Sequence, residues 1–167
     1  MSRIVRLLDS INELVGSSIA WLTFIMVLVT CLVVILRYIF NVGSIALQES
    51  VMYMHGIVFM LGIGYTLKHQ GHVRVDIFYE KFSVRTKAIV DLLGTVFFLL
   101  PLGIFFLVGS LNYVSFSWSL HESSAQPGGL PGIFLVKTLI PLMAGLLIIQ
   151  GLAEAGRSVI VILNKKT

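Results

Sequence analysis

The amino-acid sequence predicts an all-α integral membrane protein with four transmembrane helices and a short amphipathic interfacial helix between the second and third spans. The chain has 167 residues, of which 57% are hydrophobic and only 12% are charged. Soluble domains carry about a quarter charged residues, so this chain has too little polar surface to cover a water-exposed globule. Four long stretches without charged residues predict the four spans. A one-sided distribution of Lys and Arg predicts their orientation.

Each predicted span is built around one charge-free stretch. These stretches contain 23, 18, 30 and 16 residues and lie at 14–36, 50–67, 92–121 and 138–153. A spanning helix needs roughly 20 apolar residues, and apolar sequence continues past both ends of the shortest stretch. We therefore expect one membrane domain over residues 1–167, with transmembrane helices near 15–39, 46–68, 88–116 and 131–160.

The first span is predicted to begin as an amphipathic turn at the membrane interface. Apolar residues recur at helical spacing from Ile4 to Val15, and charged residues such as Asp9 and Glu13 occupy other positions. The apolar run is too long for a signal-peptide core and no A-x-A cleavage pattern follows, so we expect an uncleaved span.

Small residues and prolines are expected to shape the packing of the spans. Gly16 and the Gly62/Gly64 pair allow close contact between helices. Pro101 and Pro141 lie inside the third and fourth predicted spans, where proline kinks a helix or frees a carbonyl.

The orientation follows from the basic residues. Ten of the twelve Lys and Arg residues lie near the termini or between the second and third spans, and Arg37 and Lys137 are the exceptions. The positive-inside rule therefore places both termini and the 69–87 loop in the cytoplasm. The same distribution explains the net charge of +4 by topology, and we expect no nucleic-acid partner.

The segment GHVRVDIFYEKF, residues 71–82, interrupts the apolar sequence with charges. Val75, Phe78, Tyr79 and Phe82 fall at i, i+3, i+4 and i+7, which forms one apolar stripe on a helix. We predict an interfacial helix near 73–83 that Phe78 and Phe82 anchor in the membrane. The alternative is an ordinary solvated loop between two spans.

Charged residues near the outer ends of the spans suggest pairing. Arg37 lies about one turn before the first span ends, and Glu49 about one turn into the second. The short connection makes these helices antiparallel neighbours, so both side chains reach similar depth and an ion pair is predicted. Glu122 and Lys137 lie near the same side. Structural pairing is the preferred interpretation over a transport site, because no carboxylate lies near mid-membrane.

Two histidines in the spans are possible haem ligands. His55 is within the second predicted span and His121 at the outer end of the third, so their difference in depth fits a shared haem iron poorly. Zinc-like spacings, a nucleophile elbow and a phosphate-binding glycine loop do not occur in the sequence. The sequence therefore predicts no catalytic residue, no cofactor and no metal. Glu154 and Arg157, three residues apart, are expected to pair along one helix face.

Three motifs together carry a resemblance to a known family: RYIFN at 37–41, LQES at 47–50 and GHVRVD at 71–76. With the spacing of four spans, the chain resembles the small membrane subunit (DctQ-like) of tripartite ATP-independent periplasmic, or TRAP, transporters. Arg37 and Glu49 match the family pattern. The signature turn after the second span is matched by Gly71, His72, Arg74 and Asp76. Many members carry a tryptophan just before the glutamate, where this chain has Leu47 and Gln48.

The resemblance implies a scaffold role in the cytoplasmic membrane of a bacterium or archaeon. The implied partners are a large membrane subunit (DctM-like), a periplasmic substrate-binding protein and membrane lipid. The implied activity is ion-gradient-driven uptake of an organic acid, a 2-oxoacid or another carboxylate. Glu122, Gln126 and Lys137 are the expected outer-face contacts with these partners. Two alternatives remain at this point, a haem-binding electron-transfer subunit and a small autonomous four-span exporter.

Overall fold

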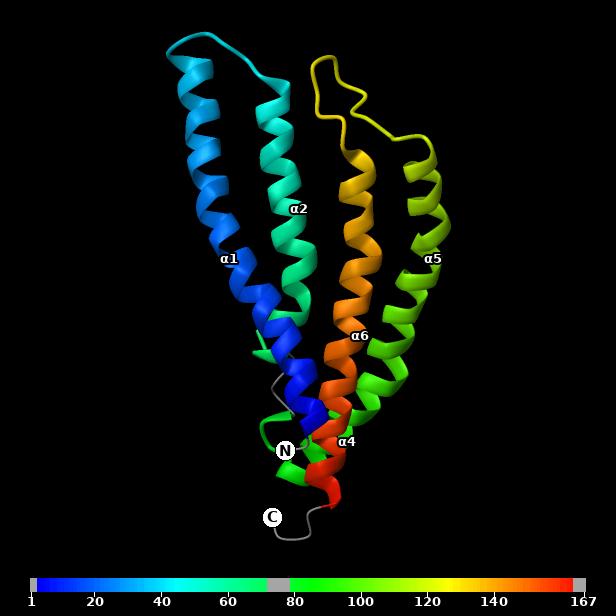
Figure 1. The fold of residues 1–167 in the computed structure, drawn as a ribbon. Coiled ribbons are helices and arrows are strands. Elements are labelled where there is room, and N and C mark those ends of the chain that lie inside the picture. Colours follow the sequence, from blue (N-terminus) through cyan, green and yellow to red (C-terminus); the bar gives the residue numbers. More distant parts are fainter. Residues whose placement is uncertain (1–2, 72–78, 164–167) are drawn as a thin grey trace.

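A computed structural model describes residues 3–71 and 79–163, and every regular element in these residues is helical (Figure 1). The helices are α1 (Arg3–Tyr38), α2 (Ile45–Lys68), α4 (Val84–Gly94), η1 (Thr95–Leu99, π-helical), α5 (Leu100–Ser119) and α6 (Ile133–Leu163). Helix α1 begins and α6 ends at the same end of the molecule, which we call the terminal end. The α1–α2 connection and the 120–132 loop lie at the opposite end, the hairpin end.

Within the described residues, four helical segments are long and apolar enough to cross a membrane, which confirms the predicted all-α class with four spans. They are α1, α2, the continuous segment Val84–Ser119, and α6. The predicted interfacial turn and first span form a single helix of 36 residues. The third segment extends beyond the predicted span near 88–116 at both ends. At its start, Ser83 caps the first turn by accepting from Thr86 N–H at 3.2 Å.

The connection between α1 and α2 is short and defined by local hydrogen bonds. Asn41 adopts a φ of 54°, a conformation that asparagine tolerates at helix C-termini. Val42 N–H donates to Leu36 O at 2.9 Å. Ser44 then caps α2, because its side chain accepts from Leu47 N–H. The two helices are therefore antiparallel neighbours, as the sequence predicts.

The helices lie side by side in the order α1, α2, α6, α5 (Figure 1). Helix α2 packs against α1 and α6, α5 packs against α6, and α1 also reaches α6. In Figure 1 the four helices converge at the terminal end and separate toward the hairpin end. Few apolar side chains are fully buried, whereas large apolar side chains are exposed along every span. Such faces suit contact with lipid or with another membrane protein.

A π-helical turn precedes Pro101 in the third segment. Leu100 N–H donates to Thr95 O, five residues back. The hydrogen-bonded turn in η1 therefore contains one residue more than that of an α-helix. Proline lacks an N–H and its ring excludes the carbonyl four residues earlier, and the wider turn accommodates it. On the facing helix, a Cβ at Gly151 would overlap Leu99, so glycine permits this close approach.

Part of the interfacial helix predicted near 73–83 lies outside the described residues, together with His72, Arg74, Asp76 and Phe78. Of the predicted residues in this segment, Gly71 and Phe82 are described. Gly71 N–H donates to Thr66 O at 2.9 Å and so closes the end of α2. Phe82 is 39% exposed, and its ring meets the Tyr79 ring edge-on with centroids 6.4 Å apart.

Candidate functional site

Polar side chains of the described residues concentrate at the two ends of the molecule. One group, at the terminal end, joins α1, α2 and α6, and we call it the terminal cluster. Its members are Asp9, Asn12, Glu13, Lys68, His69, Gln150, Glu154 and Arg157. The second group, at the hairpin end, holds the 120–132 loop against α2 and α6, and we call it the loop clamp. Its members are the side chains of Glu49, Ser117, Glu122, Ser124 and Lys137, together with the backbone N–H of Leu130.

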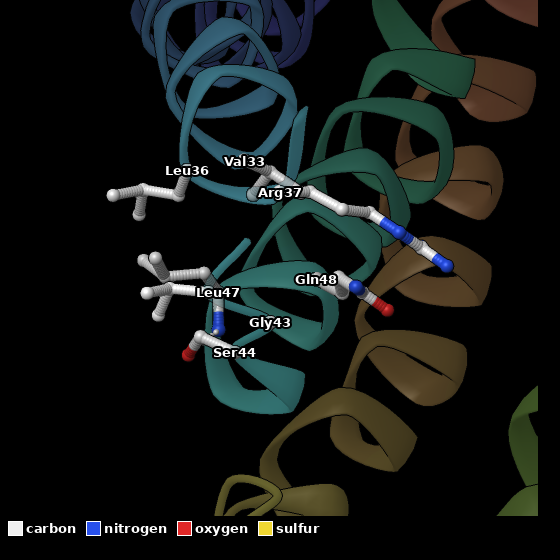
Figure 2. Close-up of a pocket in the computed structure, with 8 residues that line it drawn as sticks. Val33, Leu36, Arg37, Gly43, Ser44, Leu47 and Gln48 are labelled. Carbon is white, nitrogen blue, oxygen red and sulfur yellow. Dashed lines mark hydrogen bonds between the residues drawn. The ribbon is translucent and has the colours of Figure 1, made fainter. Parts of the chain in front are cut away.

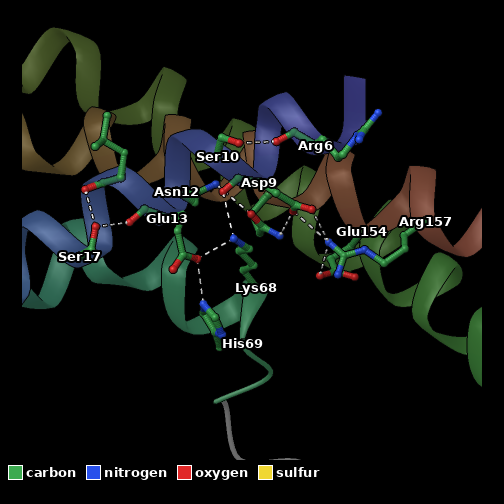
Figure 3. Close-up of polar contacts among 12 residues, drawn as sticks. Arg6, Asp9, Ser10, Asn12, Glu13, Ser17, Lys68, His69, Glu154 and Arg157 are labelled. Carbon is green, nitrogen blue, oxygen red and sulfur yellow. Dashed lines mark hydrogen bonds and ion pairs between the residues drawn. The ribbon is translucent and has the colours of Figure 1, made fainter. Parts of the chain in front are cut away.

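Asp9 is the centre of the terminal cluster (Figure 3). It lies in α1 with only 7% of its surface exposed. Its carboxylate accepts from Arg157 Nη2 at 2.9 and 3.2 Å and from Gln150 Nε2 at 3.1 Å. Both donors belong to α6. Arg157 also faces Glu154 at 3.5 Å, which confirms the pair predicted from their i, i+3 spacing.

A neutral amide pair continues the cluster into the helix interface. Asn12 and Gln150 are 1% and 0% exposed, and Asn12 Nδ2 donates to Gln150 Oε1 at 3.0 Å. Gly64 of α2 lies directly against Asn12, because a Cβ at residue 64 would overlap Asn12 Oδ1. Buried amides are stabilised by hydrogen bonds, so the Asn12–Gln150 bond favours one register of α1 against α6, while Asn12 Oδ1 has no hydrogen-bond partner among the described residues.

Helix α2 joins the cluster through its last turn. Lys68 Nζ forms an ion pair with Glu13 and donates to Asp9 O at 3.4 Å. His69 Nε2 lies 3.0 Å from the same Glu13 oxygen, and its ring packs on Tyr65 with centroids 4.3 Å apart. Positive and negative charges therefore alternate through the cluster, and α1 is held by both of its neighbours.

The chemistry of this cluster is structural. Lys68 and Arg157 already occupy the carboxylates of Glu13 and Asp9, so these oxygens are not free to bind a cation. Among the described residues, no group of three or more His, Cys, Asp or Glu is arranged to hold a metal ion. The arrangement ties three helices together.

In the loop clamp, Glu49 binds the loop rather than Arg37. Its two carboxylate oxygens accept from Ser124 Oγ and, at 2.6 Å, from Leu130 N–H. Among the described residues, no ion pair or hydrogen bond joins it to Arg37. The physical reason is competition: a backbone N–H and a hydroxyl of the loop lie within direct reach of the half-buried carboxylate.

Glu122 and Lys137 form the second part of the loop clamp. Glu122 Oε2 pairs with Lys137 Nζ of α6 and accepts from Ser117 Oγ at 2.6 Å. The hydrogen bonds from Lys137 and then Ser117 lower the pKa of the Glu122 carboxyl below its ordinary value, against a smaller opposing effect of burial. Lys137 also lies 4.2 Å from the centroid of the Tyr113 ring, a cation–π distance.

Arg37 stands apart from both groups. It is exposed, and its side chain makes no hydrogen bond or ion pair within the described part of the chain. It lines a shallow pocket at the α1–α2 connection with Val33, Leu36, Ser44, Leu47 and Gln48. Figure 2 shows Arg37 and Gln48 projecting to the same side of the helix pair. The predicted contact residue Gln126 lines a neighbouring groove with Gln48, Glu49 and Met52.

Sequence reasoning missed the centre of the terminal cluster. Asp9, Asn12 and Gln150 are polar residues inside or beside apolar helices, where they are uncommon and usually paired. That signal was available, since Gln150 lies within the fourth charge-free stretch. The pairing itself joins residues more than 130 positions apart, and local spacing does not reveal such contacts.

Together, four apolar spans and two polar groups that tie helices and loop together define a multi-pass α-helical membrane protein. Comparison with known families makes this specific. The chain belongs to the DctQ component family of tripartite ATP-independent periplasmic transporters, whose model matches residues 26–160. This confirms the resemblance drawn from the three motifs. The members of this family are components of transporters.

One curated relative is similar over most of this chain. It is the C4-dicarboxylate TRAP transporter small permease protein DctQ of Vibrio cholerae, 30% identical over 112 residues. The aligned residues are 67% of this chain and 47% of the relative, so this chain spans about half of the relative's length. No solved structure matches the chain.

Proposed function

We propose that this chain is the scaffold subunit of a TRAP transporter. In this role it braces a large membrane subunit while that subunit moves an organic acid inward, driven by an ion gradient. A periplasmic binding protein delivers the substrate. The relative from Vibrio cholerae is named for C4-dicarboxylates, so a dicarboxylate joins the 2-oxoacids as a candidate substrate.

The observation that carries this proposal is where the polar contacts lie. The terminal cluster ties α1, α2 and α6 at one end, and the loop clamp ties the loop, α2 and α6 at the other. Between them the exposed faces of the spans are largely apolar. Groups that fix helices at both ends favour a static frame, whereas a carrier needs a polar site that opens alternately to each side.

The same proposal includes the orientation. We place the terminal end in the cytoplasm and the hairpin end on the outer side of the cytoplasmic membrane, because ten of the twelve basic residues lie, along the sequence, near the termini or between the second and third predicted spans. This orientation puts the loop clamp, with Glu122 and Lys137, where a periplasmic binding protein approaches. Gln126 is exposed on the same loop and suits a direct contact.

A reconstitution experiment tests the role. The native large subunit and binding protein are placed in proteoliposomes with or without this chain, and sodium-driven uptake of a labelled C4-dicarboxylate and a labelled 2-oxoacid is measured. We expect uptake of a carboxylate only when the chain is present, and co-purification of the chain with the large subunit. Uptake at full rate by the large subunit alone would contradict the scaffold role.

A further inference from the structure

One face of α2 carries polar side chains that the rest of the described chain leaves without partners. Residues at alternating spacings of three and four are exposed along this face: Ile45, Gln48, Met52, His55 and Phe59. At 100° per residue they fall within one narrow stripe. We call this the α2 stripe. It is open although α2 is flanked by α1 on one side and α6 on the other.

Arg37 extends this stripe at the hairpin end. Its side chain and that of Gln48 line one pocket and project to the same side (Figure 2). Gln48 and Met52 also line a groove of about 310 Å³ with Ile45, Glu49 and Gln126. The surface is therefore continuous from the α1 cation, across the groove, to His55.

The depth of His55 in the membrane indicates which kind of molecule covers the α2 stripe. It lies ten residues into α2, about 15 Å from the helix start, which is near the middle of a hydrocarbon core about 30 Å thick. Its imidazole stacks on the Phe59 ring, with ring centroids 6.3 Å apart. The imidazole makes no hydrogen bond to any described residue. A lipid phosphate at the interface can pair with Arg37, but lipid tails offer nothing to an imidazole at that depth.

A second copy of this chain is a poor occupant on charge grounds. Two copies inserted in the same orientation and related by a two-fold axis along the membrane normal bring equal depths together. Arg37 of one copy then faces Arg37 of the other, and like charges at one interface disfavour the pairing. The occupant should instead supply a negative charge at the depth of Arg37.

We propose that the surface formed by Arg37 and the α2 stripe is the docking face for a transmembrane helix of the large subunit. That helix carries a carboxylate near its outer end, which pairs with Arg37, and a hydrogen-bonding side chain at the depth of His55. Side chains of the same partner occupy the part of the groove that Ile45, Gln48 and Met52 line. This inference rests on the proposed function, because it assumes that a large membrane subunit exists.

Site-specific photocrosslinking tests the face directly. Benzoylphenylalanine replaces Met52 or Phe59 in the chain, which is expressed with its native large subunit and irradiated in membranes. Matched controls carry the probe at Phe98 or Phe105 of the third segment, which are exposed to 76% and 69%. We expect adducts with the mass of the large subunit several-fold more abundant from the α2 stripe than from the controls.

A charge variant adds an independent measurement. Arg37→Gln should lower the amount of large subunit that co-purifies with the tagged chain several-fold, and Arg37→Lys should retain most of it. Arg85→Gln, an exposed cation at the terminal end, should have no effect. Thermal unfolding of each variant alone in detergent verifies that the chain still folds.

The outcomes separate this inference from the proposed function. Equal or stronger adducts at the control positions, adducts with a second copy of the chain, or adducts with lipid only would overturn the docking face. If uptake still depends on the chain in any of these cases, the scaffold role stands without this face. Loss of both co-purification and chain-dependent uptake in the unmodified complex would instead contradict the scaffold role itself.

Discussion

Single residues at the ends of the helices determine how the spans are held together. Asp9 is nearly buried and charged, and its carboxylate receives three hydrogen bonds from two residues of α6. A buried charge is tolerated only when it is paired and hydrogen-bonded. Removing one charged side chain therefore leaves its partner's charge without a counter-charge. The free energy of unfolding then falls by more than the ion pair itself contributes.

A double-mutant cycle on Asp9 and Arg157 tests this at the residue scale. Asp9→Ala should lower the free energy of unfolding by about 2–3 kcal/mol, below the range for a fully buried pair because Arg157 is 32% exposed. The double variant with Arg157→Ala should lose less than the sum of the single losses. Denaturant titration in mixed micelles measures each value. Ser10→Ala, an exposed neighbour on α1, is the control, and additive losses would argue against a direct pair.

Glu122 makes the hairpin end sensitive to acid. Lys137 and Ser117 lower the pKa of its carboxyl in the folded chain, so the ionised form is favoured by folding. The resulting stabilisation is complete above the ordinary pKa range of glutamate and is lost as the pH falls through the lowered folded-state value. It is therefore fully present at neutral pH and absent only in strong acid.

The matching prediction compares thermal unfolding from about pH 7 down to about pH 3. The melting temperature of the unmodified chain should fall more steeply on the acid side than that of Glu122→Gln, which has no charge to lose. Glu80→Gln, a change at an exposed carboxylate, should follow the unmodified chain. Parallel curves for Glu122→Gln and the unmodified chain would show that the pair with Lys137 adds no stability.

At the scale of elements, glycines determine how closely the helices approach. Gly64 of α2 faces Asn12 of α1, and Leu146 O of α6 lies 3.3 Å from the position of a Cβ. Three helices meet at this point. Asn12 does not move aside easily, because it is 1% exposed and bound to Gln150. The close packing at Gly64 and the buried Asn12–Gln150 amide pair therefore depend on each other.

Gly64→Ala should destabilise the chain for this reason. In an open helix the same change stabilises by roughly 0.5–1 kcal/mol through helix propensity. Gly109→Ala in α5 is the matched control, since nothing lies within 4 Å of its Cβ position. We expect opposite signs for the two variants in the same unfolding experiment. A stabilised Gly64→Ala chain would mean that Asn12 and α1 shift without cost.

The helices could be predicted from the sequence, whereas their contacts could be predicted only in part. Charge-free stretches of sufficient length fix the existence of the spans, because the bilayer imposes helix on each of them. The Glu154–Arg157 pair follows from spacing along one helix. Glu49 was predicted to pair with Arg37 by depth alone, but depth does not indicate that Leu130 N–H and Ser124 lie closer. The Asp9–Gln150 contact joins distant residues and depends on tertiary packing.

The described part of the molecule is a row of four spans with little buried core. Helix α2 is flanked on both sides and α5 on one, so most large apolar side chains remain exposed. A row of this kind has two broad faces, and a membrane frame can use one for lipid and the other for a partner. The proposed function depends on which end faces the cytoplasm, because the loop clamp can meet the proposed periplasmic binding protein in only one orientation.

Cysteine labelling tests that orientation. Cys31 is the only cysteine in the chain, so Cys31→Ser gives a background for single cysteines at Ser123, in the hairpin-end loop, and Thr86, at the terminal end. Both positions are exposed. A membrane-impermeant maleimide should label Ser123→Cys in intact spheroplasts and Thr86→Cys only after lysis, because the proposed orientation places the terminal end in the cytoplasm. Equal labelling of both after lysis is the control for reactivity. Labelling of Thr86→Cys in intact spheroplasts would reverse the orientation and remove the loop clamp from the side on which a binding protein arrives.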